Sequence, residues 1–265
     1  MSPETGLACS FRTTQDMQLA EALDRAARAA DDTALASWWS LGDRDAAADR
    51  SHDPMLGLQV VATATRRLRV VVSGDIPSLY SAPVRAKQIA TLDWFSQGRA
   101  EHGVDLEPVP SALTDPLRSH PDDHVGHALD QIGAMRALWT ERRATHTGPF
   151  ISFTGAIALP KPKGDRVPAT HVRATGAEDL ARYVASCGAP DGWVVWSPAA
   201  DDVDRANSVL DDVLADRAGD VRRTWVVPAT EVDRARGSAP DLGVDEVVGY
   251  FDEVPTPDDV RTLVA

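Results

Sequence analysis

The chain has 265 residues, and its 27 Lys and Arg against 40 Asp and Glu give a formal net charge of −13 at pH 7. Hydrophobic residues make up 43% and charged residues 25%, which excludes the disordered and fibrous classes of protein. The acidic balance, without a cluster of Lys and Arg, argues against a nucleic-acid partner. No apolar run approaches the roughly 20 residues that span a membrane, so we expect no membrane partner.

The first ten residues have neither a basic segment nor an apolar core, which predicts no export signal. Cys9 and Cys187 are the only cysteines, and two cysteines so far apart exclude a disulfide framework and a cysteine-rich metal site. We therefore expect a cytoplasmic protein.

Helix and strand patterns alternate along the chain. Apolar residues at helical spacing predict helices, some of which begin at a proline or an acidic residue. The predicted helices cover residues 15–30, 53–65, 83–94, 122–139, 177–186, 202–215 and 257–264. Short runs rich in β-branched and aromatic residues predict strands buried on both faces. The predicted strands cover residues 35–39, 68–72, 100–106, 169–173, 193–196, 224–227 and 246–250.

One segment departs from this alternation. Residues 148–168 are rich in Pro and Gly, and alternating side chains near their start predict an edge hairpin. Elsewhere the alternation predicts parallel strands joined by right-handed crossovers, either in a doubly wound sheet or in an α/β barrel. About eight strand candidates favour a (β/α)8 TIM barrel. We expect one barrel domain over residues 1–265, with the hairpin as an insertion and with C-terminal units that can be degenerate.

A helix motif in the segment from Asp53 to Gly103 carries a family resemblance. The motif consists of Pro83, Ala86, Lys87, Thr91, Leu92, Asp93, Ser96, Gly98 and Arg99. This pattern resembles the luciferase-like flavin monooxygenases, and the resemblance extends over residues 16–197. The Tyr80–Pro83 step and the segment GPFISFTGAIALPKPKGDRVP make the nitrilotriacetate monooxygenase branch the nearest.

The resemblance implies a TIM barrel that is usually a homodimer. It also implies an enzyme that takes reduced FMN from a separate flavin reductase and uses O2 to insert one oxygen atom into a small organic substrate. The cofactor would lie at the C-terminal face of the barrel. Two alternatives stay open: a non-catalytic barrel that has lost flavin and acts as an interaction or regulatory protein, and a hydride transferase that uses deazaflavin.

Family positions that hold the flavin are altered in this chain. The family's Asp near the flavin ring aligns with Trp39, and its Thr after the third strand aligns with Asp75, which as a plain turn residue also fits. The family's phosphate-binding Ser aligns with Ala177, at the end of the run Arg173-Ala174-Thr175-Gly176-Ala177. These substitutions weaken the expected contacts with FMN.

The start of the helix at 177 favours a helix cap over a phosphate site. Thr175 and Glu178 have the spacing of a capping box, which would satisfy the free N–H groups within the chain. Glu178 also places a negative charge where a phosphate needs a positive field. Arg173 and Gly176 remain candidate phosphate contacts.

One histidine is a candidate for catalysis. Glu101 and His102 are expected at the C-terminal end of the fourth strand, where barrel chemistry takes place. Since histidine titrates near neutrality, His102 is a candidate general acid or base, with inert pocket lining as the alternative.

The histidines of the run SHPDDHVGH suggest a metal site at first sight. His124 and His127 share one helix face, but His120 precedes Pro121 and falls outside the helix. Ser119 as a helix cap, with acidic residues in the first turn, explains the run, so we predict no metal.

Overall fold

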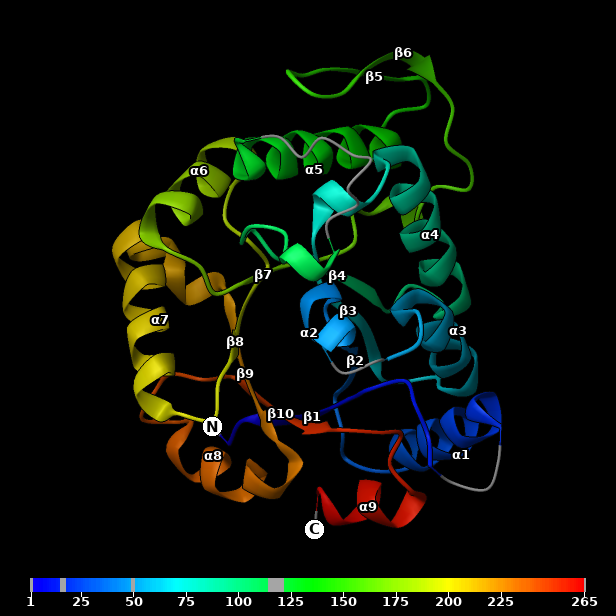
Figure 1. Ribbon diagram of the computed structural model, residues 1–265, viewed down its shortest axis with the longest axis vertical. Coiled ribbons are helices and arrows are strands. Elements are labelled where there is room, and N and C mark those ends of the chain that lie inside the picture. The colour runs from blue at the N-terminus through cyan, green and yellow to red at the C-terminus, as the bar shows by residue number, and fades with distance from the viewer. Residues whose placement is uncertain (1, 15–17, 49–50, 114–121, 265) are drawn as a thin grey trace.

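The computed structural model describes residues 2–14, 18–48, 51–113 and 122–264. Eight parallel strands close into a barrel in the order β1-β10-β9-β8-β7-β4-β3-β2, and helices surround it (Figure 1). The barrel strands are β1 (Glu4–Cys9), β2 (Ser37–Ser40), β3 (Arg69–Asp75), β4 (Ala100–Val104), β7 (Thr170–Arg173), β8 (Gly192–Trp196), β9 (Arg222–Pro228) and β10 (Glu246–Phe251). The predicted (β/α)8 barrel is confirmed.

The helices follow the strands in sequence. They are α1 (Leu19–Asp31), α2 (Asp43–Ala48), α3 (Pro54–Ala64), α4 (Ala82–Phe95), α5 (His124–Thr140), α6 (Ala177–Cys187), α7 (Ala200–Leu214), α8 (Val232–Ser238) and α9 (Pro257–Thr262). Short 3-10 turns are η1 (Pro77–Leu79), η2 (Ser111–Leu113), η3 (Lys163–Asp165), η4 (Ala215–Asp220) and η5 (Ala229–Glu231). Asp53 caps α3 by accepting from Leu56 N at 3.0 Å, and Pro54 opens that helix. Among the helices described, none is long and apolar enough to cross a membrane.

A two-stranded antiparallel hairpin stands outside the ring of helices. It pairs β5 (Ala144–Thr147) with β6 (Ser152–Ala156) beyond α5, at one edge of the molecule (Figure 1). The sequence predicts this hairpin only from residue 148 onward, because the first strand lacks a clear apolar alternation.

The first barrel strand was not predicted. Its sequence, ETGLAC, is built mainly from small residues and lacks the β-branched run that marks the other strands. The barrel requires a small residue there, since a Cβ on Gly6 would lie 2.4 Å from Ser37 Oγ on the neighbouring strand. The predicted fourth strand is also too long, because β4 ends at Val104.

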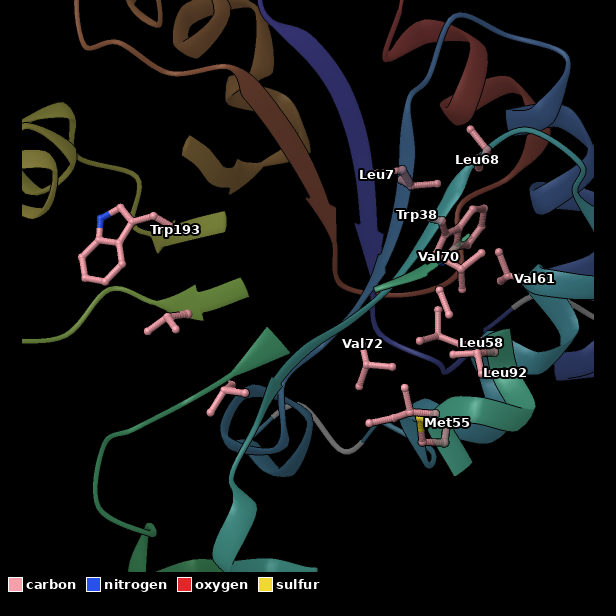
Figure 2. Packing of buried hydrophobic residues seen from close by; sticks show 14 of the residues in the cluster. Leu7, Trp38, Met55, Leu58, Val61, Leu68, Val70, Val72, Leu92 and Trp193 are labelled. Atoms are coloured by element: carbon pink, nitrogen blue, oxygen red, sulfur yellow. The ribbon is translucent and has the colours of Figure 1, made fainter. Parts of the chain in front are cut away.

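Two apolar layers hold the fold together. Outward side chains of the strands pack on the helices, as Figure 2 shows for Trp38 and Val70 beside Leu58 and Val61. A smaller cluster fills the barrel interior and consists of Ala8, Trp39, Val71, Val194, Val226 and Val248, all of them buried. The interior is therefore a packed core at mid-height, and only its two ends carry polar groups.

Candidate functional site

The N-terminal end of the barrel interior holds a buried charged network. Glu101 accepts from His171 Nε2 at 2.7 Å and lies 3.4 Å from Arg222 Nη1. Arg69 bridges Glu101, at 4.0 Å, and Glu246, at 3.0 Å. Burial alone would raise the pKa of Glu101, but the hydrogen bond from His171 and the charges of Arg69 and Arg222 lower this pKa to about 2. Glu101 is thus a structural anion below the core, away from the mouth.

Trp39 lies above this network and is fully buried inside the barrel. Its ring meets the edge of His171 at 5.2 Å between centroids, and its Nε1 donates to Ser37 Oγ at 2.7 Å. His171 packs so closely against Gly192 that no side chain larger than that of glycine fits there, because a Cβ on residue 192 would lie 1.9 Å from His171 Nδ1. Trp39 therefore belongs to the barrel core, below the position where a cofactor enters.

A bulge in β3 turns Asp75 away from the barrel interior. Val72 pairs with His102 but Asp75 pairs with Val104, so β3 holds one extra residue, and Gly74 takes a left-handed φ of 63°. Asp75 consequently faces the helices, where it accepts from Arg85 Nε at 2.5 Å and from His102 Nε2 at 2.9 Å. Burial alone would raise the pKa of Asp75, yet Arg85 and His102 lower it to about 2.

The expectation that His102 follows the fourth strand is wrong. His102 is the third residue of β4, is 1% exposed, and points outward, with its ring 6.4 Å from that of Trp139 on α5. The predicted strand over residues 100–106 already contains His102 near its start, so the expected position of His102 at the C-terminal end did not agree with that strand. A catalytic role for His102 remains a prediction, and in the structure its partner is Asp75.

Asp43 connects this outer cluster to the mouth of the barrel. It opens α2, and its carboxylate accepts from Ile76 N at 2.7 Å and from the Tyr80 hydroxyl at 2.5 Å. Burial and the charge of Asp75 raise the pKa of Asp43 to about 7. The first residue of α2 is thus a buried carboxyl group whose pKa is raised toward neutral pH.

We expect the raised pKa of Asp43 to appear in the pH dependence of the free energy of unfolding. The pKa of Asp43 in the folded state lies above the ordinary value of 3.8. The stability that Asp43 contributes is therefore complete below about pH 4 and is lost as the pH rises to about 7. Asp43→Asn should therefore reduce the loss of unfolding free energy between pH 5 and 7 by about 2 kcal/mol. Urea unfolding at several pH values measures this. Asp212→Asn on the exposed side of α7 is the control, and equal pH slopes in both variants would contradict the assignment.

Four charged side chains cross the C-terminal mouth of the barrel. Arg173, at the end of β7, donates to Asp45 Oδ2 at 2.5 Å and lies 4.0 Å from Asp105 Oδ2. Arg44 donates to the same Asp105 at 3.0 Å. Arg173 also lies 5.7 Å from the ring centroid of Trp196. Residues of α2 therefore lie over the mouth and pair with its main cation.

Helix α6 begins beside Arg173 without a side-chain cap. Its N-cap is Gly176, so the predicted capping box of Thr175 and Glu178 is wrong: Thr175 stands one residue too early to cap Ala177. Thr175 Oγ1 is a buried atom with no hydrogen-bond partner among the described residues. No heavy atom lies within 4 Å of a Cβ built on Gly176. Helix α6 thus begins uncapped, two residues after Thr175 with its unpaired hydroxyl and four residues after Arg173 at the end of β7.

The structure divides the predicted site residues into three groups. Arg173, Thr175, Gly176 and Ala177 come together at the mouth, whereas Asp75 and His102 contact each other outside the barrel and Trp39 lies in its core. The sequence interpretation missed Asp43, Arg44, Asp45 and Asp105. Asp43, Arg44 and Asp45 follow the predicted strand 35–39, and Asp105 lies near the end of the predicted strand 100–106. That position at the C-terminal ends of strands was the available signal.

The predicted absence of a metal site stays a prediction. Within the described ranges, no three His, Cys, Asp or Glu residues are arranged to hold a metal ion, and His120 and Ser119 lie outside these ranges. Asp123 caps α5 by accepting from Gly126 N at 2.9 Å.

Comparisons with known proteins bear on this site. Residues 4–225 match the family described as luciferase-like monooxygenase. The chain belongs to the luciferase-like monooxygenase family. An uncharacterised protein of Mycobacterium tuberculosis (strain ATCC 25618 / H37Rv) is 32% identical over 169 residues, or 63% of this chain and 57% of that protein. The chain thus spans little more than half of that relative.

Two further similar proteins differ in the cofactor that their names give. The FMNH2-dependent dimethylsulfone monooxygenase of Pseudomonas putida is 28% identical over 142 residues, or 52% of this chain and 38% of that enzyme. The coenzyme F420-dependent tetrahydromethanopterin reductase of Methanopyrus kandleri superposes with a TM-score of 0.75 at 14% identity, covering 100% of this chain and 97% of that one. The resemblance to the family is thereby confirmed, while the nitrilotriacetate branch stays a prediction.

Proposed function

We propose that this luciferase-like barrel is an FMN-dependent monooxygenase that acts on a small organic substrate. One observation carries the proposal: α6 begins without a side-chain cap, directly after the segment that carries Arg173 and the unpaired Thr175 hydroxyl. Such a helix end favours a phosphate, because its N–H groups and its dipole both attract an anion. These residues fit the phosphate end of a flavin.

The chain's own residues would do the following at this mouth. Arg173 and Thr175 bind the phosphate together with the first N–H groups of α6. Trp196 and Tyr250, with ring centroids 6.0 Å apart, offer an aromatic wall beside Arg173. The packed interior below, around Trp39, excludes water from beneath. A bound reduced flavin would supply electrons to O2 for the transfer of one oxygen atom to the substrate.

A non-catalytic barrel is the second candidate, and the ion pairs at the mouth favour it. Asp45 holds the guanidinium that the phosphate needs, and Asp105 adds a second negative charge 4.0 Å away. A cofactor must therefore displace Asp45 in order to bind, which lowers its affinity. If this lowered affinity prevents flavin binding, the barrel acts as an interaction or regulatory protein without a cofactor.

Anaerobic titration with reduced FMN, and separately with the deazaflavin F420, tests the proposal. We expect reduced FMN to bind with a Kd well below 1 mM and F420 to bind more weakly. A Kd for FMN weaker than about 1 mM, equivalent to about 4 kcal/mol, would favour the non-catalytic candidate. Tighter binding of F420 would favour a hydride transferase instead. Oxygen consumption with a flavin reductase as the partner then tests catalysis.

We also propose that the chain forms a homodimer through α3 and α4. Leu56 on α3 is 68% exposed and Phe95 on α4 is 42% exposed, and both line one groove between these helices. Exposed apolar side chains gathered on one face mark an interaction surface.

Leu56→Asp should therefore convert the dimer to a monomer in sedimentation velocity, because a carboxylate would be buried without a partner. Ser208→Asp on α7, on the opposite side of the barrel in Figure 1, adds the same charge and should leave the dimer intact. A monomeric wild-type chain, or a dimer unaffected by Leu56→Asp, would contradict the proposed interface.

A further inference from the structure

A pocket lies between the C-terminal end of α5 and the segment that follows β6. It has a volume of about 560 Å³ and is lined by Thr140, Arg142, Arg143, Ile157, Leu159 and Lys161. This volume is within the range of small-molecule sites in proteins. The hairpin of β5 and β6 projects beyond α5 on this side of the molecule (Figure 1).

Positive charge collects at this pocket in an otherwise acidic protein. Arg142 and Arg143 are exposed, and neither forms an ion pair with any residue that the structure describes. Exposed arginines elsewhere commonly do, as with Arg205, which donates to Asp202 at 2.5 Å on the same helix. The three lysines of the chain, Lys87, Lys161 and Lys163, all lie on this side, on α4 or just after β6. In a chain with a net charge of −13, this local excess of cations indicates a site for an anionic ligand.

The pocket lining also includes exposed apolar side chains. Ile157 is 59% exposed and Leu159 is 62% exposed, which places both among the most exposed large hydrophobic side chains described. Two exposed branched aliphatic side chains and two arginines without an ion pair among the described residues line the same pocket. This combination matches a ligand with a charged head and a hydrocarbon body.

The wall is held in place before any ligand arrives. Lys161 Nζ donates to the carbonyl oxygens of Leu138, at 2.6 Å, and of Glu141, at 2.5 Å, which fixes the segment to the end of α5. Trp94 Nε1 donates to the Lys161 carbonyl at 2.7 Å, and Lys87 Nζ donates to the Leu159 carbonyl. Because these bonds already order the backbone, binding costs little further entropy. Lys161 is thereby committed, so the free cations are the two arginines.

We propose that this pocket binds an amphipathic organic anion, with a carboxylate head on Arg142 and Arg143 and an unbranched hydrocarbon chain against Ile157 and Leu159. Guanidinium groups bind carboxylates through paired N–H donors, which an ammonium group does not reproduce. The site is independent of the flavin at the mouth. A small ligand of this kind matches the volume of the pocket, whereas an acidic protein segment would need a longer groove for its backbone.

Calorimetric titration of the full chain with decanoate, below the concentration at which it forms micelles, tests the site. We expect decanoate to bind with a Kd below about 1 mM, and hexanoate and the neutral isostere decanol to bind at least tenfold more weakly. The double variant Arg142→Gln/Arg143→Gln should weaken decanoate binding at least tenfold and leave decanol unchanged. Ile157→Ser/Leu159→Ser should reduce the advantage of decanoate over hexanoate.

The control variant Arg205→Gln/Arg217→Gln makes the same change of charge on α7 and η4 and should bind decanoate like the wild type. Equal binding of decanoate by Arg142→Gln/Arg143→Gln would overturn the proposal, and so would equal binding of decanol by the wild type. Tighter binding of a ten-residue polyglutamate peptide would assign the face to an acidic partner protein instead. Dissociation of a dimer by Ile157→Ser/Leu159→Ser in sedimentation would assign it to a second copy of the chain.

Discussion

Replacing Gly192 with alanine is expected to lower the free energy of unfolding by about 3 kcal/mol. A Cβ at this position would lie 1.9 Å from Nδ1 and 2.6 Å from Cε1 of His171, far inside van der Waals contact. His171 cannot retreat, since Glu101 holds its Nε2 at 2.7 Å and the Trp39 ring lies against it. Either the charged network or the interior core must shift. Calorimetry should record a melting temperature lower by roughly 6 to 10 °C.

Two further variants make this result specific to the contact with His171. Gly219→Ala, where no heavy atom lies within 4 Å, should change the free energy of unfolding by less than about 0.5 kcal/mol. Adding His171→Ala to Gly192→Ala should cost less than the two single changes together, because the second truncation removes the clash. Strict additivity of the two changes would contradict the steric explanation.

The barrel could be predicted from the sequence where its strands carry bulky side chains. Val70, Val71 and Val72 mark β3, and Trp193 to Trp196 mark β8, because strands buried on both faces need apolar residues throughout. The same rule misses β1, where Gly6 and Ala8 are small because neighbouring side chains fill the interior. Strand closure is a three-dimensional constraint, so a local pattern of residues does not reveal it.

The candidate site could be predicted only in part, for a similar reason. Alternation along β3 places Asp75 in the interior with Val71, but the extra residue at Gly74 reverses its direction toward Arg85. The group at the start of α6 was found from the family resemblance, in which the phosphate-binding Ser aligns with Ala177. The pairing of Arg173 with Asp45 joins residues 128 positions apart, and no spacing in the sequence indicates it.

Because Arg173 pairs with Asp45, removing the positive charge and removing the negative charge should change the affinity for reduced FMN in opposite directions. Arg173→Gln is expected to weaken the binding of reduced FMN about 30-fold, since charge-assisted hydrogen bonds contribute roughly 1.5 to 3 kcal/mol. Asp45→Asn is expected to strengthen it about tenfold, because the phosphate no longer displaces a competing carboxylate from Arg173. Fluorescence titration under anaerobic conditions measures both changes.

Arg182→Gln is the matched control for the loss of a cation, since Arg182 lies on α6 but pairs with Asp123 at 2.7 Å away from Arg173. Its affinity for FMN should equal that of the wild type. If Asp45→Asn binds FMN and the wild type does not, the mouth is a phosphate site that α2 keeps closed. If Arg173→Gln binds FMN as tightly as the wild type, the flavin lies elsewhere, and the uncapped start of α6 is a structural feature without a ligand.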